Sequence, residues 1–422
     1  MGDRNASKPR SGEGHRSFGS LGTRVLWFCW FGWALDLYDL LLLSFLRTEV
    51  QADLGLNAEQ FGTVLAVQLG ASALGGFLLG RLADRRGRVL GLSLSIVLFS
   101  VGTLLTGLVD GFLGLFLARA LTGFGVGGEW GIGHALVSES VPEGSRGRAA
   151  GILQSAAPVG VAMAGLMASV LGESVGWRGC FMLSAIPGLS VFLLRFVLSG
   201  SVKSGRQEQA ERRQVVPLSA FLNPPLLRPG VLLLVVLTLH MATFWSVYTW
   251  LPGELRKLHS AGSVAMLQLW ISGVHLVADL VFGWLADRFG RRMVFFAFTV
   301  SFAAGLSVVA LRFDELVTDL FAFGLVFVPL GLGMGTWSVF GVMFREHFPS
   351  GLRATASSGL YNLARGVQGV AQPAIGVSIA ATGSLTTALW FGASATLGSA
   401  LFAGLLPHQS SVDESTSRPE SV

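Results

Sequence analysis

Long apolar stretches alternate with short polar gaps along nearly the whole chain. A helix that crosses a membrane needs about 20 predominantly apolar residues. Twelve stretches meet this need, at 25–46, 61–80, 89–108, 112–137, 147–172, 180–198, 229–252, 264–286, 293–311, 317–344, 355–380 and 386–405. The pattern predicts an all-α integral membrane protein with twelve transmembrane helices.

One polar gap is much longer than the others. Residues 199–228 combine basic residues with a Pro-rich end, and they separate six predicted spans from six. The predicted parts are an N-terminal tail at 1–24, a six-helix bundle at 25–198, a linker at 199–228, a second six-helix bundle at 229–405 and a C-terminal tail at 406–422.

The basic residues outside the spans lie mostly on one face of this arrangement. The opposite face keeps only Arg47, Arg178, Arg256, Lys257 and Arg312. Loops rich in Lys and Arg stay on the cytoplasmic side of a membrane. We therefore expect both termini and the linker to be cytoplasmic, in a multi-pass protein surrounded by lipid in the inner or plasma membrane.

The composition supports this class and excludes others. Half of the residues (51%) are hydrophobic, 13% are charged, and the net charge is +5. A nucleic-acid surface would need basic residues clustered on one soluble face. The lysines, Lys8, Lys203 and Lys257, do not follow a phosphate-loop pattern, which argues against an ATP-driven pump. The dispersed polar residues argue against a membrane enzyme, and no metal site or cofactor is expected.

A nine-residue phrase occurs twice, each time in a polar gap between two spans. The first copy carries Gly80, Asp84, Arg85, Gly87 and Arg88, and the second carries Gly283, Asp287, Arg288, Gly290 and Arg291. A repeat at half the chain length predicts two equivalent halves. An acid at a helix end can hold a neighbouring helix terminus, so we interpret Asp84 and Asp287 as a charge lock that gates access. The alternative is that these loops only enforce topology.

Several charged residues fall inside predicted spans, where each costs roughly 2.5–3.5 kcal/mol. The first span contains Asp36 and Asp39, three residues apart and hence on one face. The fourth span contains Arg119 and Glu129, and the eleventh contains Arg365. Counting residues along the spans places Asp39 at the depth of Arg119, which predicts an ion pair between them. Asp36 falls near the depth of Arg365, where an arginine could grip a carboxylate through two hydrogen bonds.

These acids are candidates for proton coupling. Two carboxylates on one helix face repel each other unless one carries a proton, so Asp36, Asp39 and Glu129 are proton-coupling candidates. Structural pairing is the alternative for the two aspartates, and helix packing is the alternative for Glu129. His275 and Asp279, four residues apart, form either a relay or a local hydrogen bond.

The repeated phrase resembles the loop between helices 2 and 3 of the major facilitator superfamily and its echo between helices 8 and 9. The run around Glu129, together with Tyr361, Asn362 and Arg365, is similar to the proton-coupled organic-acid branch, which includes sialate and monocarboxylate importers. The Asp36-x-x-Asp39 pattern is also similar to that of aromatic-acid symporters.

The resemblance implies a secondary transporter that moves a small organic anion of the monocarboxylate, sialate or aromatic-acid class by proton symport and alternating access. A proton gradient would supply the energy, and the protein would be monomeric. The substrate-binding candidates are Arg365, Arg119, Tyr361, Asn362, Gln154 and Trp337. A proton-driven exporter of drugs or metabolites is the alternative within transport, and a nutrient receptor on a transporter scaffold is the alternative outside it.

Overall fold

The structure is a computed structural model that describes residues 18–172, 174–186, 188, 216–255, 257–382 and 384–407. Within these ranges it contains helices, turns and bends but no strand, which confirms the predicted all-α class. The long helices are α1 (Gly19–Phe45), α3 (Ala58–Arg86), α4 (Arg88–Thr106), α5 (Phe112–Ser140), α9 (Pro224–Leu255), α10 (Ala261–Phe289), α11 (Arg291–Leu311), α15 (Arg353–Thr382) and α16 (Thr386–Gly404).

Two predicted spans are each divided between shorter helices. The span 147–172 consists of α6 (Arg146–Gln154), α7 (Ala156–Leu166) and η2 (Met167–Leu171). Pro158 has no N–H to donate to the carbonyl of Gln154, which explains the break between α6 and α7. The span 317–344 consists mainly of α13 (Leu320–Met334) and α14 (Trp337–His347). The remaining short elements are η1 (Glu143–Ser145), η3 (Leu218–Leu222) and α12 (Phe313–Leu316).

The number of membrane spans is supported only in part. In the described part of the chain, eight helices are long and apolar enough to cross a membrane. Helices α5, α15 and α16 also coincide with predicted spans but are rich in Gly, Ser, Thr or charged residues. Residues 174–186 are helical, whereas 189–198 of the sixth predicted span lie outside the described residues. The count of twelve therefore stays a prediction.

Some helix ends differ from the predicted boundaries. Helix α1 begins at Gly19, inside the predicted tail 1–24, and α9 begins at Pro224, inside the predicted linker 199–228. Most of the predicted tails and linker, at 1–17, 199–215 and 408–422, lies outside the described residues.

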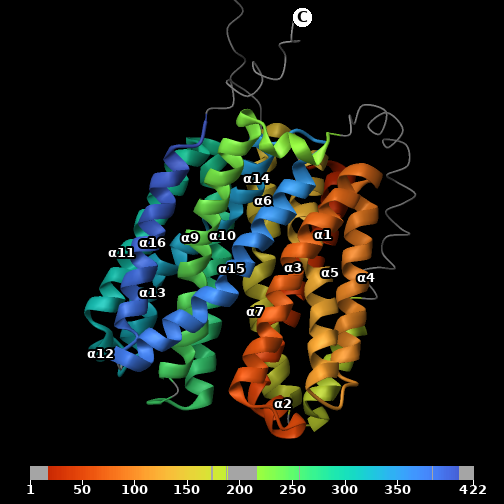
Figure 1. Ribbon diagram of the computed structural model, residues 1–422. Helices are drawn as coiled ribbons and strands as arrows, with labels where there is room; N and C mark the ends of the chain where they lie inside the picture. The colour runs from red at the N-terminus through yellow and green to blue at the C-terminus, as the bar shows by residue number, and fades with distance from the viewer. Residues whose placement is uncertain are drawn as a thin grey trace, which may run out of the picture.

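The helices form two bundles that lie side by side (Figure 1). Helices α1, α3, α4, α5 and α7 make one bundle, and α9, α10, α11, α13 and α16 make the other. Helix α15 packs against α3 and α5 of the first bundle, and α10 packs against α6 and α7. The two halves therefore meet along α3–α15 and along α6–α7–α10.

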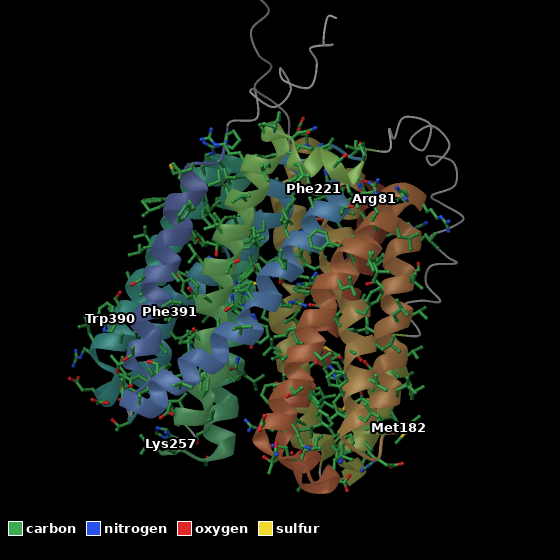
Figure 2. The ribbon with its side chains drawn as sticks, in the orientation of Figure 1. Arg81, Met182, Phe221, Lys257, Trp390 and Phe391 are labelled. Atoms are coloured by element: carbon green, nitrogen blue, oxygen red, sulfur yellow. The ribbon has the colours of Figure 1, made fainter. Side chains whose placement is uncertain are left out.

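The flanks of the molecule expose apolar side chains, while charges gather near its ends. Trp390 and Phe391 are exposed on the flank of α16, and Lys257 lies at one end (Figure 2). Arg85 and Arg288 of the repeated phrase are also exposed. Apolar flanks suit a helix bundle in lipid, because each helix satisfies its backbone hydrogen bonds internally.

Another short helix that was not predicted lies between α1 and α3. Helix α2 (Arg47–Leu54) follows α1 and carries Asp53. Trp177 Nε1 donates to Asp53 Oδ2 at 3.1 Å, and Arg178 forms an ion pair with the same carboxylate. These bonds hold the pKa of Asp53 below its usual value. They fix α2 against the helical segment 174–186.

Candidate functional site

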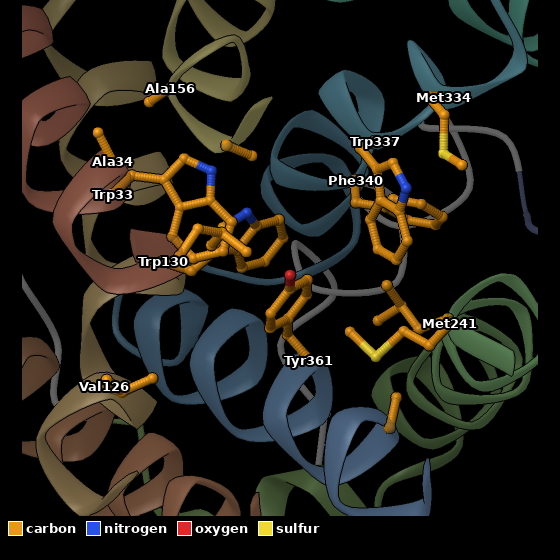
Figure 3. Packing of buried hydrophobic residues seen from close by; sticks show 14 of the residues in the cluster. Trp33, Ala34, Val126, Trp130, Ala156, Met241, Met334, Trp337, Phe340 and Tyr361 are labelled. Atoms are coloured by element: carbon orange, nitrogen blue, oxygen red, sulfur yellow. The ribbon is translucent and has the colours of Figure 1, made fainter. Parts of the chain in front are cut away.

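A cavity lies between the two halves and is lined by α1, α6, α7, α9, α10, α14 and α15. Its lining includes Trp33, Gln154, Phe244, Trp337, Tyr361 and Arg365. Figure 3 shows Tyr361 between the Trp33–Trp130 pair and Trp337, with its hydroxyl oxygen pointing toward the space between them. Both halves therefore contribute aromatic walls to one central cavity.

Four aromatic rings, those of Trp33, Tyr361, Trp337 and Phe244, form a row along this cavity. Tyr361 contacts Trp33 with ring centroids 6.4 Å apart and Trp337 at 6.3 Å, and Trp337 contacts Phe244 at 5.8 Å. Tyr361 also stacks on Trp130 at 3.8 Å. Such stacked and edge-on pairs are favourable. The aromatic row therefore offers a firm apolar wall to a ligand.

Arg365 and Asp36 approach each other at one end of the aromatic row. Arg365 Nη2 lies 3.9 Å from Asp36 Oδ2, and both side chains are buried. Among the residues described, neither carboxylate oxygen of Asp36 has a hydrogen-bond donor. The two side chains thus lie near each other, as their depths predict, but without the two parallel bonds with which a guanidinium grips a carboxylate.

Glu129 of α5 is a second buried acid near this pair, and it interacts electrostatically with both Asp36 and Arg365. Its carboxylate lies against Gly32 of α1, where a Cβ atom would come within 2.6 Å of Glu129 Oε1. Neither oxygen of Glu129 has a donor in the described part of the chain. Leaving a buried polar group unsatisfied costs about 1–3 kcal/mol, and more when it is charged.

Asp39 and Arg119 form the ion pair that their depths predict. Arg119 Nη2 lies 2.8 Å from Asp39 Oδ2, and Thr103 donates to Asp39 Oδ1 at 2.6 Å. Arg119 Nε also donates to Gln68 at 3.2 Å. These bonds link α1, α3, α4 and α5 within the first half. Asp39 and Arg119 therefore satisfy each other, unlike Asp36.

Two of the substrate-binding candidates are held by other helices. The amide of Asn362 donates to the carbonyl of Gly127 at 2.7 Å, so it joins α15 to α5. Gln154 lines the cavity and accepts a bond from Trp130 Nε1 at 3.2 Å. The structure thus brings Gln154, but not Asn362, to the cavity wall.

His275 and Asp279 lie together on α10, on the other side of the cavity. His275 Nε2 is 3.4 Å from Asp279 Oδ2, and Ser338 donates to Asp279 Oδ1 at 3.0 Å. His275 lines the cavity, whereas Asp279 is fully buried behind it. The His275–Asp279 pair therefore borders the cavity through His275.

Asp84 of the repeated phrase caps a helix of the other half. Its carboxylate accepts bonds from the backbone N–H groups of Ala354 (3.2 Å) and Thr355 (2.8 Å) at the start of α15. Arg88 forms an ion pair with the same carboxylate. The first N–H groups of a helix lack intrahelical partners and carry partial positive charge, so this acid ties α3 to α15.

Asp287 makes the equivalent contact in the opposite direction. It accepts bonds from the backbone N–H groups of Gly147 and Arg148, both at 2.9 Å, at the start of α6. Each half thus holds a helix start of the other half with one carboxylate. We call the end of the molecule with these two contacts the motif end.

The glycines of the repeated phrase meet two separate structural requirements. A Cβ atom at Gly80 would lie 2.6 Å from a backbone carbonyl oxygen of α15, and one at Gly283 would lie 2.4 Å from a carbonyl oxygen of α6. Gly87 and Gly290 have positive φ angles of 107° and 89°, which other residues rarely adopt. The first glycine of each copy permits close approach of the halves, and the second glycine of each copy permits the turn.

Further ion pairs surround the motif end. Glu139 lies 3.1 Å from Arg88 Nη2 and 2.9 Å from Arg353 Nη1, which joins the two halves. Arg291 pairs with Glu346 within the second half. Arg88 and Arg291 of the repeated phrase thus have bonding partners at this end of the molecule.

Sequence reasoning missed several cavity residues, among them Trp33 and Ser272. Trp33 lies three residues before Asp36 and Ser272 three before His275, so each shares a helix face with a residue that was singled out. That spacing was the available signal, but a serine or tryptophan in an apolar span is too common to stand out.

Two helical halves around a central cavity, with contacts that close one end, define a membrane protein of the transporter class. The chain belongs to the major facilitator superfamily, whose family model matches residues 26–262 and 254–421. It is accordingly a multi-pass protein of the plasma membrane.

Known relatives and solved structures agree with this family. The "Probable 4-methylmuconolactone transporter" of Cupriavidus pinatubonensis is 30% identical over 372 residues, which cover 85% of this chain and 84% of the relative. The sialic acid transporter NanX of Escherichia coli is 26% identical over 360 residues, which cover 84% and 87%. The structure of the proton:xylose symporter XylE with 6-bromo-6-deoxy-D-glucose matches with a TM-score of 0.74 at 17% identity, covering 93% of this chain and 97% of that chain. That last likeness bears on the fold alone.

Proposed function

We propose that this chain is a secondary active transporter that carries a small organic anion across the membrane together with protons. The observation that supports this most directly is the buried group of Arg365, Asp36 and Glu129 beside the central cavity. One cation and two unsatisfied acids in mutual range suit the binding of an anion and a proton in one place.

In this proposal Arg365 is the principal anion ligand. A guanidinium can bind a carboxylate through two parallel hydrogen bonds, and Tyr361, Trp337 and Gln154 line the same cavity. The sialic acid transporter among the relatives supports an organic acid as the substrate. In this proposal the acid is of the monocarboxylate, sialate or aromatic class. Arg119 is the weaker candidate because Asp39 already engages it.

Asp36 is our first choice for the proton carrier, and Glu129 is the second. An ionised carboxylate without donors or water is costly, and a bound proton removes that cost. A substrate anion on Arg365 would also compete with Asp36 for the guanidinium, so anion binding favours a proton on Asp36. Thermodynamic linkage makes this coupling reciprocal. The His275–Asp279 pair follows these two acids as a candidate proton relay.

The cross-half contacts of Asp84 and Asp287 would act as the gate. Both belong to the closed motif end, which the basic residues predict to be cytoplasmic. Alternating access would require these contacts to break while the opposite end closes. The proton gradient would be the energy source, without a cofactor.

Reconstituted liposomes test the proposal. We expect a benzoate, lactate, pyruvate, sialate or dicarboxylate to accumulate inside when the outside is acidic, and accumulation to cease when a proton ionophore is added. Reversing the gradient separates import from a proton-driven exporter. Binding of the acid without transport under any gradient would contradict the proposal and favour a receptor.

A further inference from the structure

The wall of the cavity formed by α10 and α14 carries two polar atoms without a partner besides His275 Nε2, which lies 3.4 Å from Asp279 Oδ2. Ser272 Oγ and Trp337 Nε1 are buried, belong to residues that line the cavity, and have no hydrogen-bond partner among the described residues. Nearly all buried polar groups in proteins have a partner. Two such groups on one cavity wall indicate that a ligand supplies the partner.

Ser272 differs from two serines in neighbouring long helices, Ser246 of α9 and Ser307 of α11. Ser246 donates to the carbonyl of Ala242 at 2.6 Å, and Ser307 donates to that of Ala303 at 2.8 Å, each within its own helix. The hydroxyl of Ser272 has no such bond within the described ranges. It is therefore available to a group in the cavity.

The aromatic row connects this wall with the anion site. The guanidinium of Arg365 lies 5.9 Å from the Trp33 ring and 5.1 Å from the Tyr361 ring. Trp337 follows Tyr361 in the row, with ring centroids 6.3 Å apart. A flat ligand that lies along the row thus meets Arg365 with one end and the Trp337 side with the other.

We propose that Ser272 and Trp337 form a subsite for a second oxygen of the substrate, across a planar carbon skeleton from the carboxylate that Arg365 holds. This inference rests on the proposed function. An indole N–H only donates, and a serine hydroxyl donates or accepts. The group in the subsite is therefore a hydrogen-bond acceptor, such as a ring carbonyl or a second carboxylate. The substrate class is a planar bifunctional acid.

Two ligands of nearly the same shape isolate this contact. 4-Acetylbenzoate carries a carbonyl oxygen where 4-isopropenylbenzoate carries a methylene group, and benzoate reports the anion site alone. Isothermal titration of the purified full chain should give roughly three- to tenfold tighter binding of the acetyl compound than of the isopropenyl compound. Ser272→Ala and Trp337→Phe should each reduce this ratio toward one, and the benzoate affinity of each variant reports what the same change does to the rest of the cavity.

The matched control is Ser307→Ala, which removes a hydroxyl that bonds within α11 and should leave the ratio unchanged. If the two para-substituted acids bind equally to the wild type, or if neither binds while benzoate does, the subsite is wrong and the proposed function stands. An equal loss for all three acids in both variants would also overturn it, because the residues would then only shape the cavity. Failure of the wild type to bind any organic acid would overturn the proposed function and this inference with it.

Discussion

Two acidic residues on the same helix face have different surroundings in this protein. Asp36 and Asp39 are one turn apart on α1, yet Asp39 has Arg119 and Thr103 as bonding partners. Asp36 has Arg365 at 3.9 Å and no hydrogen bond within the described chain. The difference separates a structural acid from a candidate proton carrier.

Neutralising Asp36 tests this distinction. We expect Asp36→Asn to abolish proton-driven accumulation while sparing substrate counterflow, which requires no net proton movement. Both are measured in reconstituted liposomes. Asp39→Asn serves as the contrast, because it leaves the buried Arg119 unpaired and should destabilise the fold by about 3–5 kcal/mol. Normal gradient-driven accumulation by Asp36→Asn would move the assignment to Glu129.

The anion ligand can be tested by a change that keeps its charge. Arg365→Lys retains the cation but loses the two-point geometry of the guanidinium, so we expect at least a tenfold loss of affinity for the carboxylate, measured by titration. Arg85→Lys is the control, since Arg85 is exposed. Unchanged affinity in Arg365→Lys would show that two-point recognition is the wrong account.

At the scale of helices, the repeated phrase explains how two elements from different halves are held. Asp84 binds the first turn of α15, and Asp287 binds the first turn of α6. A carboxylate next to a helix N-terminus typically contributes about 0.3–1 kcal/mol. The repetition of the phrase therefore reflects two equivalent contacts at the motif end.

We predict that Asp84→Asn and Asp287→Asn slow transport and leave equilibrium substrate affinity within about twofold. Each substitution weakens a helix contact that lies outside the cavity, so it alters the balance between conformations. Initial uptake rates and titration of the same preparations separate the two effects. A large loss of affinity with normal exchange rates would be the contrary result.

Close approach of α3 and α15 gives a second test at this scale. Gly80→Ala places a Cβ atom 2.6 Å from a carbonyl oxygen of α15, whereas at Gly70 of the same helix no atom of the described chain lies within 4 Å of a new Cβ. We expect Gly80→Ala, but not Gly70→Ala, to open the motif end. Faster alkylation of Ser138→Cys, a buried position there, measures the opening. Equal labelling in both backgrounds would count against the contact as a gate.

At the scale of the whole molecule, our proposal couples anion binding and proton binding in the cavity between the halves. If one proton binds with each anion, the Kd of the anion should rise about tenfold per pH unit on the alkaline side of the titration. Titration of the wild type over a pH series measures this slope, and Asp36→Asn should give a nearly flat profile. A flat profile in the wild type would refute coupling at this site.

The sequence by itself determined the helical class, the two-fold repeat and the Asp39–Arg119 pair. In an apolar run of membrane length, a helix satisfies the hydrogen bonds of the backbone within the run itself. The fixed rise of about 1.5 Å per residue then converts position in the sequence into depth in the membrane. These are local properties, so they can be read along the chain without knowledge of its packing.

Only the tertiary structure decided which polar groups remain unsatisfied. The sequence did not show that Asp36 lacks a hydrogen-bond donor in the described chain, that Asn362 bonds to α5, or that Ser272 lines the cavity. It also did not show that each acid of the repeated phrase caps a helix of the opposite half. The physical reason is that a side chain's partners depend on the rotation and crossing of helices that are distant in sequence, and packing between the halves sets both.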